Sequence, residues 1–190
     1  MKKIEVPPTA YLEETNRILK DCGLLLVSVG EDGRPNVMAI GWGLIGNLWR
    51  KPFFMVAVRP SRHTHKLIEE TGDFTVNVPG KGMEETVDYC GTVSGRDHDK
   101  FRERNLTPVQ GKMVESPIIS ECRIHYECKV AYKTKVKANQ LPKEILSSSY
   151  PHGNYHTLYF GEIMATYADE DDEKNTWRMF RETPEICPFR

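Results

Sequence analysis

Residues 24–45 read LLLVSVGEDGRPNVMAIGWGLI. Two apolar runs rich in β-branched residues flank the turn residues GEDGRP, a pattern that predicts a β-hairpin. Runs of the same kind follow at 51–60 (KPFFMVAVRP) and 73–80 (DFTVNVPG). Because a proline or a glycine ends each run, both are predicted to be strands followed by turns.

The segments around these strands carry helical patterns. Apolar residues at helical spacing predict a helix over 9–22. A second helix is predicted over 61–72, with Ser61 as its N-cap and Gly72 at its C-terminal end. The further elements predicted along the chain are helices over 83–93 and 95–105 and strands over 119–136 and 156–169.

The order of these elements favours a mainly β fold with flanking helices. Six or seven strands without a βαβ rhythm indicate a small barrel, because closure removes exposed sheet edges. No GxGxxG follows a strand, so the dinucleotide-binding fingerprint is absent. We expect one domain over 1–190, with an N-terminal helical segment (1–22) and a charged C-terminal tail (170–190).

The charge and cysteine content exclude several classes of protein. Lys and Arg (26) nearly balance Asp and Glu (27), which argues against broad binding to nucleic acid or to an acidic membrane surface. Five cysteines without a CxxC pair argue against a disulfide scaffold or a zinc ribbon. No secretory signal and no membrane-spanning run are recognised, so a cytoplasmic location is expected.

The segment RPSRHTHKLI, which begins at Arg59, concentrates donors and positive charge at a predicted helix start. A helix start offers backbone N–H groups and the positive end of the dipole to an anion such as phosphate. Ser61 and Thr64 add hydroxyl groups, and Arg59, Arg62 and Lys66 add charge. The alternative is an ordinary surface helix whose basic residues are solvated.

Two further features, the histidines of this segment and the stretch NVMAIGWG (36–43), allow a functional or a structural interpretation. His63 and His65 are two residues apart on a helix and face different sides, so they are not predicted to share a metal ion. In NVMAIGWG, glycines inside a strand indicate close approach of a ligand or of another backbone. Trp42 in this stretch either covers a planar ring or fills the core at a bulged barrel corner.

Side chains suited to acid–base or nucleophilic catalysis are scarce. The stretch DYCGTVSGRDHDKF (88–101) mixes Asp, Cys and His without a recognised metal-ligand spacing, so solvated helix termini are favoured there. No Ser-His-Asp arrangement and no nucleophile elbow are recognised. This scarcity is typical of a protein whose cofactor performs the reaction.

Together these stretches resemble the flavin reductase-like FMN-binding split-barrel family, most closely its flavoredoxin branch. The motifs VRPSRxT and TGxFxVNVP, followed by CGxxSGRDxDKF and a late HTLYFGEI, carry the resemblance from about Gly23 to Asp169. The resemblance implies a six-stranded Greek-key split β-barrel. It also implies non-covalent FMN and a homodimer with the flavin near the subunit interface.

The same resemblance implies a set of FMN-binding residues. These are Asn36, Met38, Ala39, Trp42, Val58, Arg59, Pro60, Ser61, Arg62, Thr64, Asn77, Gly91, Ser94 and Lys100. Ser61, Arg62 and Thr64 would contact the 5′-phosphate, which identifies the anion expected at the helix start. Related reductases carry Gly-Asp-His before the late strand, whereas this chain reads HGNYH. His156 matches the histidine but lacks the acidic neighbour, so a catalytic role and a plain turn histidine both remain open.

The function that the resemblance implies is an FMN-dependent oxidoreductase or electron-transfer protein. Electrons would pass from NAD(P)H or a protein donor, through FMN, to a flavin, a protein or a small acceptor. One alternative is an oxidase like those acting on pyridoxamine phosphate, which needs a second basic cluster that is not recognised here. The other is a non-catalytic protein that binds flavin or stores electrons.

Overall fold

The structure, a computed structural model, describes residues 2–170. Its strands are β1 (Lys3–Glu5), β2 (Leu24–Val29), β3 (Pro35–Ile40), β4 (Gly43–Leu48), β5 (Lys51–Val58), β6 (Asp73–Val78), β7 (Pro108–Val109), β8 (Ile118–Ile119), β9 (Ile124–Lys135) and β10 (Thr157–Asp169). Its helices are α1 (Leu12–Asp21), α2 (His63–Thr71), α3 (Glu84–Thr92), α4 (Lys100–Glu103) and α5 (Lys143–Ser149), with a 3-10 turn at Ala138–Gln140.

The main sheet curls into a split barrel. Its strand order is β3-β2-β6-β9-β10-β5-β4, every pairing is antiparallel, and β1 pairs with β10. The two edge strands, β3 and β4, are consecutive in the chain and are joined through Gly41 and Trp42. So short a link brings the two edges together, which forces the sheet to curl. The mainly β split-barrel fold is therefore confirmed.

The number of strands differs from the expectation. Among the described residues the main sheet holds eight strands and β7 pairs with β8 separately, so the count of six is not confirmed. The expected hairpin partner of β2 is divided into β3 and β4, because the chain bends between the two edges of the sheet. The expected N-terminal helical segment also contains β1, which is held by its pairing with β10.

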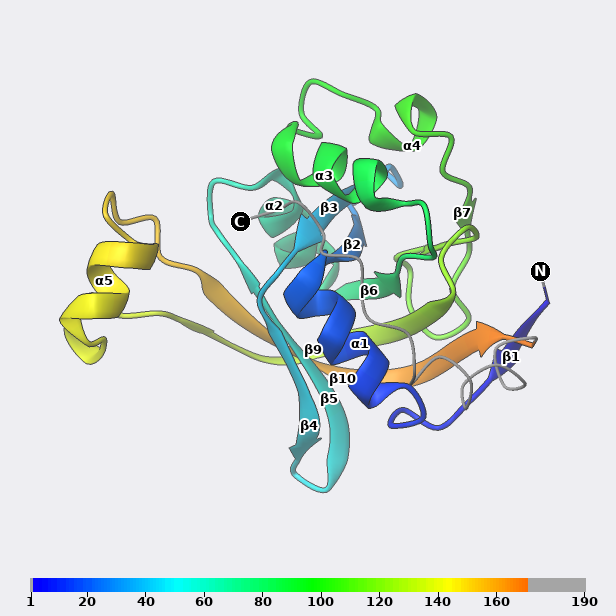
Figure 1. The fold of residues 1–190 in the computed structure, drawn as a ribbon, viewed down its shortest axis with the longest axis horizontal. Helices are drawn as coiled ribbons and strands as arrows, with labels where there is room; N and C mark the ends of the chain where they lie inside the picture. Colours follow the sequence, from blue (N-terminus) through cyan, green and yellow to red (C-terminus); the bar gives the residue numbers. More distant parts are fainter. Residues whose placement is uncertain (1, 171–190) are drawn as a thin grey trace.

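The uninterrupted apolar run of β2 is explained by burial on both faces. Leu24 and Leu26 pack into the barrel interior with Phe54 and Phe74. Leu25 and the next residue of that face, Val27, pack into a second cluster beneath α3 and α4. In Figure 1, α2, α3 and α4 gather on the same side of the barrel as β2 and β3. This second layer is where the candidate site forms.

The helical expectations are confirmed in part. Gly72 ends α2 in the left-handed conformation (φ 72°), as predicted for a C-cap. The helix expected over 95–105 is reduced to α4, which is capped by the Asp99 carboxylate accepting from Arg102 N at 3.2 Å. Helix α5 was not predicted; it lies at the end of an arm formed by β9 and β10, away from the barrel (Figure 1). No helix within residues 2–170 is both long and apolar enough to cross a bilayer.

A buried hydrogen bond between Thr15 and Tyr126 attaches α1 to the barrel. Thr15 Oγ1 lies 2.8 Å from Tyr126 Oη, and both residues are fully buried. A Thr15→Val substitution keeps the shape but leaves the phenol without this partner, so we expect the free energy of unfolding to fall by about 1–2 kcal/mol in urea denaturation. If the hydrogen bond is the cause, the same substitution should cost little in a Tyr126→Phe background.

Candidate functional site

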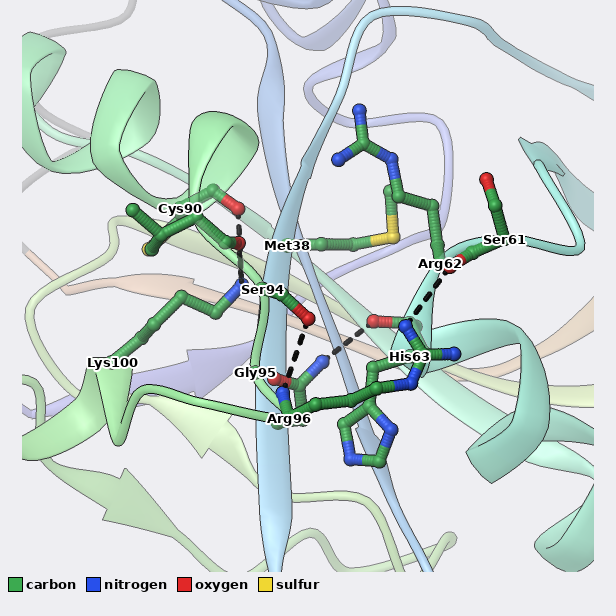
Figure 2. A pocket seen from close by; sticks show the side chains of 12 residues that line it. Met38, Ser61, Arg62, His63, Cys90, Ser94, Gly95, Arg96 and Lys100 are labelled. Atoms are coloured by element: carbon green, nitrogen blue, oxygen red, sulfur yellow. Dashed lines mark hydrogen bonds between the residues drawn. The ribbon is translucent and has the colours of Figure 1, made fainter.

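A pocket of about 140 Å³ lies where the start of α2 meets the segment that connects α3 to α4, with β3 beneath (Figure 2). The residues that line it are Asn36, Met38, Ser61, Arg62, His63, Thr64, Cys90, Val93, Ser94, Gly95, Arg96 and Lys100. Three of these side chains are cations and none is a carboxylate. A pocket with this charge, at the N-terminus of a helix, is suited to an anion.

Two arginines cross the pocket in opposite directions. Arg62, the N-cap residue of α2, donates from Nη1 to the carbonyl oxygen of Gly91 at 3.2 Å. Arg96, from the segment before α4, donates from Nη1 to the carbonyl oxygen of Ser61 at 3.0 Å (Figure 2). The two guanidinium groups therefore hold the rims together through neutral carbonyls, and a phosphate offers each a stronger, charged acceptor.

Lys100 lies beneath the rim and is almost fully buried. Its Nζ donates to the carbonyl oxygens of Cys90 at 3.1 Å and Val93 at 3.4 Å, at the C-terminal end of α3. Burial, together with the charge of Arg62, lowers the pKa of this ammonium to about 8. An anion in the pocket would counter both effects, because a nearby opposite charge favours the protonated form.

A close approach between Gly95 and β3 shapes the floor of the pocket. Asn36 Nδ2 donates to Thr64 Oγ1 at 2.7 Å, which fixes the amide and leaves the threonine hydroxyl hydrogen free to point elsewhere. A Cβ on Gly95 would lie 1.8 Å from Asn36 Oδ1. A side chain at this glycine of the SGRD motif would therefore clash with Asn36. The sequence predicted close approach at other glycines, those of NVMAIGWG.

His63 is the first residue of α2 and also lines the pocket. Its Nδ1 is enclosed and has no hydrogen-bond partner within the described part of the chain. Burial lowers the pKa of the imidazole, and the charges of Arg96, Lys66 and Lys100 lower it further. In the absence of an anion, the ring is therefore neutral at neutral pH.

An aromatic cluster lies beside the pocket. The rings of Trp42 and His156 have centroids 4.7 Å apart, and His156 Nδ1 lies 2.8 Å from Tyr150 Oη. Burial, and then the charge of Arg59, lowers the pKa of His156 to about 4. Trp42 is 46% exposed, so the interpretation that places it in the core is wrong. An exposed indole can cover a planar ligand.

The start of α2 differs from the expectation at Ser61. The N-cap is Arg62, with no side-chain capping bond, so the prediction of Ser61 as N-cap is wrong. Asn154 Nδ2 donates to Ser61 Oγ at 2.7 Å, which holds that residue outside the helix. Arg59 contacts the same loop, since it donates from Nη1 to the carbonyl of Asn154 at 3.2 Å, and it also donates from Nη2 to that of Ser149, the last residue of α5, at 2.8 Å. These contacts join the pocket to the loop that precedes His156.

The pocket brings together half of the residues that the resemblance implies. Within it lie Asn36, Met38, Ser61, Arg62, Thr64, Ser94 and Lys100, and outside it lie Ala39, Trp42, Val58, Arg59, Pro60, Asn77 and Gly91. Val58 is fully buried in the barrel core. Gly91 contributes through its carbonyl, which holds Arg62.

Asn77 is placed away from the pocket, in the wall of the barrel. It is fully buried, and its Oδ1 accepts from Ile119 N at 3.0 Å and from His125 Nδ1 at 2.8 Å. Its Nδ2 donates to Thr75 Oγ1 at 3.0 Å. These bonds occupy the amide, so the structure gives Asn77 a role in joining β6 to β8 and β9.

Sequence reasoning did not single out Arg96, and it considered His63 only as a metal ligand. Both lie within the motifs that carried the resemblance, RPSRHT and SGRD. The available signal was the mixture of a basic residue and small residues in SGRD. The contact between Arg96 and the start of α2 spans 35 residues of sequence, which no local pattern predicts.

A family model and a known protein both match most of this chain. A family model described as "Flavin reductase like domain" matches residues 22–184. An uncharacterized protein of Archaeoglobus fulgidus is 34% identical over 137 residues, which cover 72% of this chain and 67% of that protein.

Two solved structures of flavoredoxins are also similar. Flavoredoxin of Desulfovibrio vulgaris (Miyazaki F) superposes with a TM-score of 0.65 at 29% identity, covering 80% of this chain and 71% of that one. Flavoredoxin from Methanosarcina acetivorans superposes with a TM-score of 0.61 at 28% identity, covering 90% and 77%. Since the family model matches most of the chain, this protein belongs to the flavin reductase-like domain family.

Proposed function

We propose that this protein binds FMN non-covalently and transfers electrons through it, as an FMN-dependent oxidoreductase related to flavoredoxins. The observation that supports this most is the pocket at the start of α2, which has three cationic side chains and no carboxylate among its lining residues. In a chain of the flavin reductase-like family, this pocket would suit the 5′-phosphate of FMN. The phosphate is a dianion above about pH 6, so it would give a charged partner to the buried ammonium of Lys100 and to the exposed guanidinium groups of Arg62 and Arg96.

The residues present fit both ends of FMN. Arg62, Arg96 and Lys100 would bind the phosphate together with the N–H groups that open α2. The exposed ring of Trp42, in contact with His156, would cover one face of the isoalloxazine. The bond from Asn154 to Ser61 connects these two parts of the site.

Bound FMN would supply the redox chemistry, by accepting and releasing electrons or a hydride. The chain would bind and orient it and keep water from one face of the ring. His156 is neutral at neutral pH because burial lowers its pKa to about 4, so it adds no charge beside the flavin. We expect a homodimer in the cytoplasm that takes electrons from NAD(P)H or a protein donor and passes them to a flavin or protein acceptor.

A spectroscopic experiment tests this function. The purified protein is reconstituted with FMN, separated from free flavin, and titrated without oxygen with NADH and then NADPH. Retained flavin that loses its colour supports a reductase. Retained flavin that keeps its colour supports a protein electron donor or a storage role, the non-catalytic alternative. A protein that retains no flavin contradicts the proposal.

Lys100 predicts a pH dependence of FMN affinity. Its pKa is lowered to about 8 in the pocket, and a bound phosphate is expected to raise it. Between these two pKa values the complex holds one proton more than the free protein, so affinity falls as pH rises above about 8, by up to about tenfold per pH unit. Fluorescence titration with FMN from pH 7 to pH 10 measures this fall. A Lys100→Met protein should bind more weakly and show a flat profile there; an unchanged slope would contradict the assignment.

A further inference from the structure

His63 lines the pocket and carries an enclosed polar atom that is so far unexplained. Its Nδ1 is enclosed without a partner in residues 2–170. Buried polar atoms in proteins nearly always have a partner, so an exception calls for an explanation. His65, two residues further along α2, provides the contrast because its Nε2 lies 3.0 Å from Thr157 Oγ1 and it does not line the pocket.

The charges around His63 come from three elements. Lys66 and Glu70 lie on α2 itself, Arg96 lies in the segment before α4, and Lys100 lies on α4. Burial is the largest effect on the imidazole pKa, the three cations act in the same direction, and Glu70 alone opposes them. In the free protein His63 is therefore neutral at neutral pH, and its Nδ1 has no hydrogen-bond partner within residues 2–170.

We propose that His63 is a proton-linked ligand of the phosphate: it takes up a proton from solvent as the phosphate enters and donates a hydrogen bond to it. This inference rests on the proposed function, because it assigns a residue to the same phosphate site. A dianion among Arg96, Lys66 and Lys100 reverses the sign of the local field. Nδ1 then gains a charged acceptor, and the protonated ring becomes the favoured form.

The coupling between protonation of His63 and phosphate binding favours ligands that carry a phosphate. A phosphate dianion can drive the protonation of His63, whereas riboflavin, which has the same ring and no phosphate, cannot. Because proton uptake and FMN binding are linked, the affinity for FMN must increase as pH falls through the pKa that His63 has in the complex. This pH range lies below the range in which Lys100 changes the affinity. The second pKa of the phosphate, about 6, limits this gain on the acidic side.

The test counts the protons taken up when FMN binds. Isothermal titration calorimetry at about pH 7, in two buffers with different enthalpies of ionisation, gives the number of protons per complex. We expect the unaltered protein to take up about half a proton or more with FMN and none with riboflavin. The His63→Gln protein should lose this uptake, and the matched His65→Gln protein should keep it.

A second measurement does not depend on any variant. Titration of the ¹⁵N-labelled histidines by NMR should show the pKa of His63 rising to about 7 or above when FMN or inorganic phosphate binds. A pKa that stays below this value, or equal proton uptake by the unaltered and His63→Gln proteins, overturns the inference and leaves FMN binding intact. Failure of the unaltered protein to bind FMN overturns the proposed function and this inference with it.

Discussion

A protein with both Arg62→Met and Arg96→Met is expected to bind FMN at least about a hundredfold more weakly than the unaltered protein. Each guanidinium at present donates to a carbonyl across the pocket, Arg62 to Gly91 and Arg96 to Ser61. A bound phosphate would replace these neutral acceptors with a charged one. Since each hydrogen bond to a charged group contributes about 1.5–3 kcal/mol, losing two corresponds to about 3–6 kcal/mol before relaxation.

Riboflavin separates the phosphate from the ring in this experiment. Its affinity should change by less than about threefold in the double variant, because the contacts around Trp42 remain. A matched control removes two arginines outside the pocket, Arg17→Met and Arg34→Met, and should leave FMN affinity nearly unchanged. Equal losses in both double variants would show that net charge, and not the pocket, governs binding.

The two arginines also brace the fold, so stability has to be measured beside affinity. Each of their hydrogen bonds joins α2 to the region of α3 and α4 across the pocket. Losing both should lower the free energy of unfolding by about 1–3 kcal/mol, which leaves the domain folded at room temperature. Circular dichroism spectra that match those of the unaltered protein would assign the lost affinity to the pocket.

The parts of the fold that could be predicted from sequence are those with local causes. The strand β5 and the left-handed end of α2 at Gly72 follow from apolar runs and from glycine's tolerance of positive φ. The start of α2 could not be predicted, because a bond from Asn154 holds Ser61 outside the helix. The division between β3 and β4 depends on the curl of the whole sheet.

The same distinction applies to the candidate site. The pocket residues at the start of α2, Arg62 and Thr64, lie in one short motif that a resemblance can carry over. Arg96 and the enclosed nitrogen of His63 belong to the candidate site only because two segments that are distant in sequence meet there. Asn77 shows the opposite case, since strand pairing turns its amide toward His125 and away from the pocket.

A Gly161→Ala substitution is expected to lower the free energy of unfolding by about 2–3 kcal/mol. Gly161 lies in β10, beside an irregularity in the pairing with β9. A Cβ there would lie 2.6 Å from Phe74 Cζ and 2.8 Å from Cys128 Cβ, and both residues are fully buried. Neither neighbour can move into solvent, so the added methyl group strains the packing of the barrel interior.

Urea denaturation measures this loss, and Gly46→Ala is its matched control. Gly46 also lies in a strand, β4, but a Cβ there meets nothing within 4 Å, so its substitution should change stability by less than about 0.5 kcal/mol. If the clash with Phe74 is the cause, a Phe74→Leu background should reduce the cost of Gly161→Ala by more than about half. A cost that is the same in both backgrounds would instead implicate the contact with Cys128 or the backbone of β10, because the strain would not then depend on the ring that the methyl group meets.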